Sequence, residues 1–222
     1  DVYKRQAGMC CEWVRRDKRN TAVGVDIDQE VLAWGEKNNL SRLKPEARLR
    51  IRLMQADVRK LQAPRPVEVV LAMNFSYQLF MTRKKLGGYL RKVHESLAKD
   101  GILFMDAFVG YDAYRTIKEK TRHDGFKYIW EQQSYNPING HMRCHIHFRF
   151  PDGSVLKRAF SYVWRMWTLP ELRELLAEAG FSRVTVYWEK SDPVTGEGTG
   201  VYAPTSRGAA DPGWVCFLVA EK

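Results

Sequence analysis

The chain of 222 residues contains no apolar run close to the roughly 20 residues that a membrane-spanning helix needs, which argues against a membrane protein. It has only four cysteines (Cys10, Cys11, Cys144 and Cys216), and their spacing fits no metal site. The adjacent pair is poorly placed to form a disulfide, and no secretory signal is evident. These features predict a cytoplasmic protein with reduced thiols.

Basic residues are numerous but lack the arrangement of a nucleic-acid interface. The formal net charge is +10, from 36 basic and 26 acidic side chains. A charge of this sign can indicate binding to nucleic acid. The basic residues are scattered, however, and no block interleaves them with aromatic residues as a single-strand binding platform does. A solvated surface rich in Lys and Arg is therefore favoured, with RNA or DNA as the alternative partner.

The overall composition is that of a folded protein. Hydrophobic residues make up 45% of the chain and aromatic residues 12%, which indicates a globular rather than a disordered chain. The length is sufficient for one substantial core. We therefore expect a single domain over residues 1–222 that carries one insertion.

Two short apolar runs near the start of the chain each end at a carboxylate. Residues 21–28 contain Asp26 and residues 51–58 contain Asp57, and a helical pattern covers 29–40 between them. Alternation of apolar runs with helices predicts an α/β fold with a parallel sheet. Because ligands bind beyond the carboxyl ends of such strands, we expect both acids to reach one small molecule.

The chemistry of these acids suits a nucleoside. An ionised carboxylate offers two acceptor oxygens, which can take both hydroxyls of a ribose, and a second acceptor can take the amine of an adenine. The alternative is that Asp26, Asp28 and Asp57 only cap the helices that follow, since Asp is a favoured N-cap residue. Because two acids follow adjacent strands, we favour ligand binding over helix capping.

The segments Val-Gly-Val-Asp-Ile-Asp-Gln-Glu-Val-Leu (23–32) and Gln-Ala-Asp-Val (55–58) resemble the second and third cofactor motifs of class I S-adenosylmethionine-dependent methyltransferases. The resemblance implies a Rossmann-like, mostly parallel sheet, with S-adenosylmethionine as cofactor. It also implies that Asp26 holds the ribose hydroxyls and that Asp57 meets the adenine amine. A dinucleotide-binding Rossmann domain is the alternative, but it has no regular counterpart to the second acid.

A third apolar run, 67–74, is followed by Asn74-Phe75-Ser76-Tyr77 at its carboxyl end. In the family that it resembles, this loop lies beside the methionine part of the cofactor and the methyl acceptor. The alternative is that Asn74 only caps the turn. Tyr77 and Arg165 are our candidates for lining the acceptor pocket. The cofactor-binding set that the resemblance implies is Asp26, Ile27, Asp57, Val58, Asn74 and Phe75.

We expect the first strand of this fold and its Gly-rich loop to be absent from the sequence. A helical pattern starts at Ala7, and Lys4, Arg5 and Gln6 do not suit a strand that is buried on both faces. The expectation is an N-terminally truncated chain that by itself binds cofactor poorly and is marginally stable. A non-enzymatic or inactive remnant is the corresponding alternative.

Residues 127–164 interrupt the alternation of strands and helices. Three alternating runs with turns at 136–140 and 151–154 predict a three-stranded antiparallel insertion, which the resemblance places over the acceptor site. We expect His145 and His147 on a polar outer face of this sheet, and the alternative is a face turned toward an anionic acceptor. No third ligand follows them at a recognisable spacing and arginines flank them, so we expect no metal site.

Further elements are predicted on both sides of the insertion, and together they lead to one functional hypothesis. We expect a helix over 82–97, a tight turn at 99–101 before a strand at 102–108, and a helix that starts with a capping box at Thr168. The stretch 191–212 is expected to be a long loop. The hypothesis is methyl transfer to a small-molecule acceptor, with a nucleic-acid methyltransferase as the alternative. No residue is identified as a general base.

Overall fold

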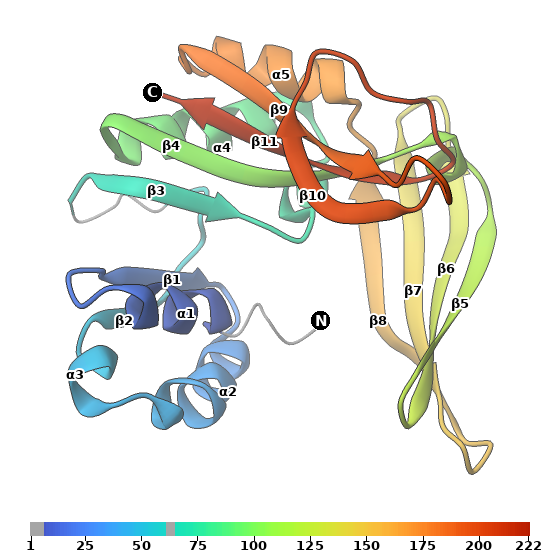
Figure 1. Cartoon of the computed structure of the whole chain (residues 1–222), viewed down its shortest axis with the longest axis horizontal. Coiled ribbons are helices and arrows are strands. Elements are labelled where there is room, and N and C mark those ends of the chain that lie inside the picture. Colours follow the sequence, from blue (N-terminus) through green and yellow to red (C-terminus); the bar gives the residue numbers. More distant parts are fainter. Residues whose placement is uncertain (1–6, 61–64) are drawn as a thin grey trace. The chain divides into compact units, whose positions relative to one another are not determined.

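A computed structural model describes residues 7–60 and 65–222 of the chain. The chain divides into two compact units, 1–62 and 63–222, and each has its own sheet and helices (Figure 1). None of the described helices is long and apolar enough to cross a membrane.

The first unit contains a two-stranded parallel sheet. Ala22 of the first strand lies opposite Ile51 of the second, and the pairing runs in register to Asp26 and Gln55. The predicted βαβ pattern of this segment is therefore confirmed. The elements are α1 (Gly8–Arg16), β1 (Ala22–Asp26), α2 (Gln29–Asn38), a 3₁₀ turn (Leu40–Arg42), α3 (Pro45–Arg48) and β2 (Ile51–Gln55).

Arg50 fastens α1 to the sheet of this unit. Its guanidinium donates hydrogen bonds to the backbone oxygens of Val14 (2.9 Å), Asp17 (2.9 Å) and Asn20 (2.7 Å). The last carbonyls of a helix have no partner within the helix, so this arginine satisfies groups that would otherwise need water. A Cβ at Gly24 would lie 2.8 Å from a methyl group of Leu53, so any larger residue there would displace the Leu53 side chain.

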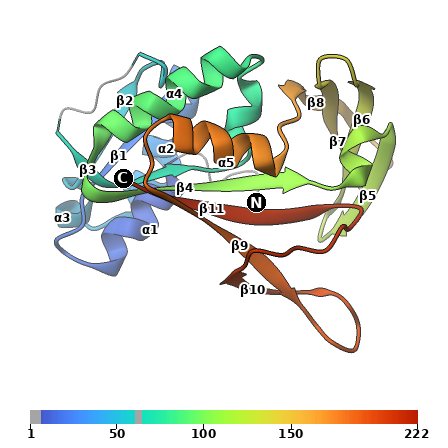
Figure 2. The same ribbon diagram turned by 90° about the horizontal axis from the view of Figure 1, so that it is seen from above.

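The second unit contains a five-stranded sheet in the order β10-β9-β11-β4-β3. β3 and β4 pair in parallel, whereas β11 pairs antiparallel with both β4 and β9. Strands β3, β4 and β9 therefore run in one direction, with β11 inserted against them. Helices α4 and α5 pack together on one face of this sheet (Figure 2). The bounds are β3 (Val67–Ala72), α4 (Arg83–Ser96), β4 (Leu97–Val109), α5 (Leu169–Glu178), β9 (Arg183–Ser191), β10 (Gly198–Pro204) and β11 (Trp214–Glu221).

The core of the second unit lies between this sheet and its two helices. Leu86 of α4, Leu172 of α5 and Leu103 of β4 are all fully buried there. The capping box at the start of α5 is confirmed, because Thr168 and Glu171 each accept a hydrogen bond from the other's backbone N–H. The predicted helix over 82–97 is also confirmed, with Thr82 as its N-cap.

The insertion has four strands, so the prediction of three was wrong. The additional strand is β5, whose sequence Ile-Lys-Glu-Lys-Thr-Arg-His has six exposed side chains out of seven. An edge strand with two solvated faces shows no apolar alternation, which explains why the sequence pattern missed it. The sheet order is β5-β6-β7-β8, with bounds β5 (Ile117–His123), β6 (Phe126–Asn136), β7 (His141–Arg149) and β8 (Val155–Arg165).

The predicted polar outer face of this sheet is also corrected. His145 and His147 are 5% and 8% exposed, so neither faces solvent. His145 bonds the Ser161 hydroxyl at 2.8 Å and the Gln133 side chain at 2.9 Å. His147 bonds the Glu131 carboxylate at 2.8 Å. Both imidazole rings therefore form hydrogen bonds with neighbouring strands, which offsets the cost of burying them.

Two further predictions about β-structure were wrong in detail. The stretch 191–212 is not one loop, since it contains β10, an edge strand rich in Gly and mostly exposed. The turn expected at 99–101 lies inside β4, where Asp100 has a left-handed backbone (φ 63°). The pairing of β3 with β4 shifts register between Val67 and Val69 at the same level.

The first strand of the fold remains a prediction. Among the described residues, β1 pairs only with β2, and β3 pairs only with β4. The segment 1–6, on which the prediction of a missing strand and Gly-rich loop rests, lies outside the described residues.

Candidate functional site

Asp26 is the last residue of β1 and is partly buried. One of its carboxylate oxygens accepts a hydrogen bond from the backbone N–H of Asp28 at 3.0 Å, which forms a tight turn. The backbone N–H of Ala56 donates to the Asp26 carbonyl at 2.9 Å, so the ends of β1 and β2 are held together. The second carboxylate oxygen of Asp26 accepts no hydrogen bond from the described residues, which leaves it available to a ligand.

Asp28 has a different role. Its side chain accepts hydrogen bonds from the backbone N–H groups of Glu30 and Val31, so it is the N-cap of α2. The capping alternative therefore describes Asp28, whereas Asp26 stabilises only the turn before the helix.

Asp57 lies two residues beyond the end of β2, at the same edge of the parallel pair as Asp26. Arg59 clamps it: the guanidinium Nε donates to Oδ1 at 2.8 Å, and the Arg59 backbone N–H donates to the same oxygen at 2.9 Å. These hydrogen bonds lower the pKa of Asp57 from its ordinary value to about 2. Asp57 is therefore ionised at neutral pH and acts only as an acceptor.

Each of these two acids is followed by an exposed apolar side chain. Ile27 is 65% exposed and Val58 is 41% exposed. Together, the four side chains at this edge provide two acceptors for hydroxyl or amine donors and two apolar surfaces for an aromatic base. These are the kinds of group that recognition of a nucleoside requires.

The carboxyl end of β3 carries a strained turn. Asn74 and Phe75 both have left-handed backbone conformations, with φ of 62° and 54°. The carboxylate of Asp106, which is 6% exposed on the neighbouring strand β4, accepts the backbone N–H of Asn74 at 2.7 Å and that of Phe75 at 2.8 Å. Two successive non-glycine residues in this region are uncommon, and such strain is concentrated at ligand sites.

Sequence reasoning missed Asp106. The signal was present, because Asp106 is the one charged residue in the apolar run 102–108. A carboxylate in a buried strand needs hydrogen-bond donors, and here two backbone N–H groups of the turn supply them.

Tyr77, a predicted pocket residue, lies in the core of the second unit and is 0% exposed, as is its neighbour Gln78. The Gln78 amide and the Phe108 backbone lie near the Tyr77 hydroxyl, but neither this hydroxyl nor the Gln78 amide forms a hydrogen bond of ordinary geometry with a described residue. Burial, followed by the charge of Asp106, raises the pKa of Tyr77. Its hydroxyl therefore stays protonated.

Arg165, the other predicted pocket residue, is at the end of β8. Its guanidinium lies 3.7 Å from the ring centre of Trp167, 3.4 Å from the backbone oxygen of Met81 and 3.5 Å from the carboxylate of Glu171. It lines a cavity of about 370 Å³ together with Tyr114 and other residues of the second unit.

Solved structures share the architecture of this chain. A methyltransferase from Clostridium acetobutylicum that depends on S-adenosylmethionine is similar over 91% of this chain and 75% of its own, with 16% identity and a TM-score of 0.64. The CcbJ methyltransferase from Streptomyces caelestis is similar over 89% and 73%, with 15% identity and a TM-score of 0.62. The chain has the fold of S-adenosylmethionine-dependent methyltransferases.

A third structure of this methyltransferase fold contains the cofactor. It is CalS10 with bound S-adenosylmethionine, an amino pentose methyltransferase from Micromonospora echinaspora, which is similar over 100% of this chain and 92% of its own. Its identity is 13% and its TM-score is 0.58. No protein-family model and no curated protein sequence matches the chain. Because all three identities are low, the similarity concerns the methyltransferase fold and not the acceptor.

Proposed function

We propose that this protein transfers a methyl group from S-adenosylmethionine to a small-molecule acceptor. The observation that carries the proposal is the placement of Asp26, with one carboxylate oxygen available, at the carboxyl end of a parallel strand in a chain with the methyltransferase fold. Ligands of open α/β sheets bind at this edge.

Each residue of the site has a role that its environment supports. Asp26 accepts the ribose hydroxyls, and the ionised Asp57 accepts the adenine amine. Ile27 and Val58 pack against the base through side chains that are otherwise exposed. Asn74 and Phe75 form the turn at the carboxyl end of β3, where Asp106 fixes their backbone.

The cofactor, when bound, supplies an activated methyl group on a sulfonium. The work left to the protein is to hold the acceptor in line with that group and to exclude water, which lowers the entropic part of the barrier. Accordingly, no general base is assigned. Tyr77 and Arg165 stay our candidates for the acceptor pocket.

A small-molecule acceptor is supported by the cavity of about 370 Å³ beside Arg165 in the second unit. CalS10, whose acceptor is an amino pentose, shows that the same fold can serve such an acceptor. The four free cysteines, three of them buried, support a reducing cytoplasmic location.

Asp26→Asn tests the proposal, with Asp28→Asn as its matched control. The first substitution keeps an oxygen for the turn but removes the charge that receives the ribose. Calorimetry with S-adenosylhomocysteine should show at least a tenfold loss of affinity, since a charge-assisted hydrogen bond contributes about 1.5–3 kcal/mol. Asp28→Asn should bind as the unmodified protein does, because Asn caps a helix as well as Asp. Equal affinity of the two variants would remove Asp26 from the site. No binding by a chain that also carries the expected first strand and Gly-rich loop would overturn the proposal.

A further inference from the structure

A second cavity, of about 460 Å³, lies in the second unit where β4 ends and β11 begins. Three of the residues that line it are acidic (Asp112, Glu119 and Glu189), and none is Lys, Arg or His. The chain has 36 basic and only 26 acidic residues, yet every charged residue that lines this cavity is acidic. This excess of negative charge requires an explanation.

The Glu189 carboxylate is held in position by the edge strand β10. The backbone N–H of Gly200 donates to Oε1 at 2.7 Å, and the Tyr202 hydroxyl donates to Oε2 at 3.4 Å. A Cβ at Gly198 would lie 2.6 Å from the same carboxylate, so a glycine is required for it to lie there. The carboxylate is thus placed by its surroundings and is not a mobile surface group.

Gln132 supplies an independent observation. It lines the cavity, is 2% exposed, and its Nε2 donates to the backbone oxygens of Asp112 at 2.8 Å and Arg115 at 2.9 Å. The two carbonyl acceptors fix the orientation of the amide. Its own oxygen accepts no hydrogen bond from a described residue. This oxygen is not among the fully enclosed unpaired atoms of the described residues, so it keeps contact with solvent and is open to a donor in the cavity.

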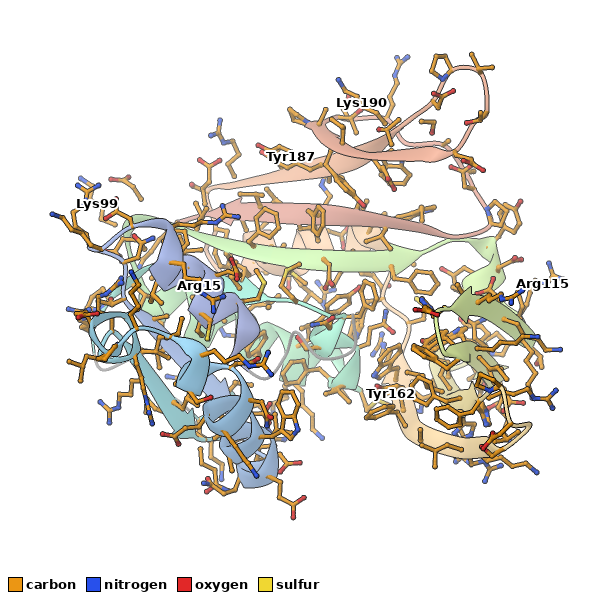
Figure 3. All side chains as sticks on the ribbon, turned by 60° about the horizontal axis from the view of Figure 1, so that its bottom comes forward. Arg15, Lys99, Arg115, Tyr162, Tyr187 and Lys190 are labelled. Carbon is orange, nitrogen blue, oxygen red and sulfur yellow. The ribbon has the colours of Figure 1, made fainter. Side chains whose placement is uncertain are left out.

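The negative charge of the cavity is only partly compensated. Asp112 forms an ion pair with Arg115 at 2.8 Å. Neither Glu119 nor Glu189 forms an ion pair with a basic residue in the described part of the chain. Figure 3 places the neighbouring basic residues Arg115 and Lys190 beside β5 and on the β9–β10 hairpin, and both are exposed. Two carboxylates therefore remain for a ligand.

A metal ion does not fit this cavity well. No group of three or more His, Cys, Asp or Glu side chains within the described residues is arranged to hold a metal. The acids are spread around a cavity that is also lined by Phe108 and Trp214. Aromatic faces and separated carboxylates together suit an organic cation.

We propose that this cavity binds a protonated amine with an apolar body. Such a ligand can donate to Glu119, to Glu189 and to the Gln132 oxygen, and its apolar part lies against the aromatic side chains. The proposal goes beyond methyl transfer, because nearby carboxylates keep an amine protonated and an ammonium has no lone pair to accept a methyl group. The site recognises its ligand and does not transform it.

The test uses the full chain and three probes of the same size: benzylammonium, benzyl alcohol and benzoate. Ligand-detected NMR titration at neutral pH should show saturable binding of benzylammonium, at least tenfold tighter than that of the other two. No saturable binding of benzylammonium up to about 10 mM, where a fragment of this size still binds a matching site, would overturn the proposal. Equal binding of benzoate would overturn it as well.

Two variants locate the binding in the cavity. Glu119→Gln and Glu189→Gln should each weaken benzylammonium binding about tenfold, which corresponds to the loss of one charge-assisted contact. The control is Glu174→Gln, an exposed residue of α5 that does not line the cavity. Circular dichroism confirms that all three variants are folded. Unchanged affinity in both cavity variants would overturn the assignment. Because no methyl donor is involved, the result is independent of the test of Asp26.

Discussion

At the scale of single residues, Tyr77 and Gln78 are unusual because their polar atoms are buried without partners. Both side chains are 0% exposed, and three of their polar atoms lack a hydrogen bond to any described residue. Burying such a group without a partner costs about 1–3 kcal/mol in proteins. Only Ser76 separates the two residues from the strained Asn74–Phe75 turn, so the unpaired polar groups and the backbone strain lie in one segment.

We expect Tyr77→Phe and Gln78→Met to leave the free energy of unfolding unchanged or to raise it by up to about 2 kcal/mol, because each removes an unsatisfied buried group and keeps the volume. Denaturant melts measure this, with the exposed Tyr111→Phe as control. A loss of more than about 1 kcal/mol for Tyr77→Phe would show that the hydroxyl has a partner, such as a water. If Tyr77 instead acts at the acceptor, Tyr77→Phe impairs methyl transfer without affecting stability.

Asp26, Asp28 and Asp57 show how much of the site sequence alone could predict. Their position after apolar runs was enough to place Asp26 and Asp57 at one edge of a parallel pair. Which acid caps the helix could not be read from residue type, because Asp26 and Asp28 are both suitable caps. The Arg59 clamp on Asp57 depends on the conformation of the turn, which the sequence does not specify.

At the scale of elements, Asp106 connects two strands at the predicted ligand edge. It lies on β4, and its two hydrogen bonds hold the turn after β3 in a conformation that is rare for non-glycine residues. The ring of Phe75, in that turn, packs 5.7 Å from Phe108, and Phe75 contacts both hydrophobic cores of the second unit. Asp106 therefore sets the position of the loop that we assign to the cofactor.

Asp106→Asn should lower the free energy of unfolding by about 1.5–3 kcal/mol, since one acceptor oxygen becomes an NH₂ group that faces a backbone N–H. The measurement is chemical denaturation, and Asp100→Asn is the matched control because it is exposed and has a left-handed backbone that Asn tolerates. Equal stability of the two variants would contradict the role given to Asp106. S-adenosylhomocysteine affinity, measured on the folded fraction, tests whether the turn also contributes to binding.

The strands that sequence reasoning missed share a physical cause. β5 and β10 are edge strands whose side chains are mostly exposed, so their positions follow from backbone pairing and not from burial. Sequence patterns detect burial, and for this reason the core helices α4 and α5 and the buried strand β4 were predicted while the two edges were not. The proposed cation cavity could not be predicted either, because the Glu189 carboxylate is held by a backbone N–H of the edge strand β10.

At the scale of the whole molecule, the charge and the cavities indicate different partners. A net charge of +10 attracts polyanions at low ionic strength, whereas the two sites that we propose are suited to small molecules. Basic residues that are distributed over the surface neutralise few phosphates at a time. The resulting affinity for RNA should be of the non-specific kind and should fall steeply with salt.

The expected outcome is that the protein binds a labelled RNA hairpin and a single-stranded RNA only weakly at about 150 mM salt, with dissociation constants no tighter than the roughly micromolar limit of non-specific binding. Fluorescence anisotropy at low and at physiological salt measures this, and benzylammonium titrations under the same conditions show whether the small-molecule site persists. Non-specific binding should show the same affinity for both RNAs, because phosphate contacts carry no sequence information. A submicromolar dissociation constant at physiological salt for one RNA but not the other would instead favour a nucleic-acid methyltransferase. The acceptor would then have to be sought on RNA, while the assignment of Asp26 to the cofactor would be unaffected.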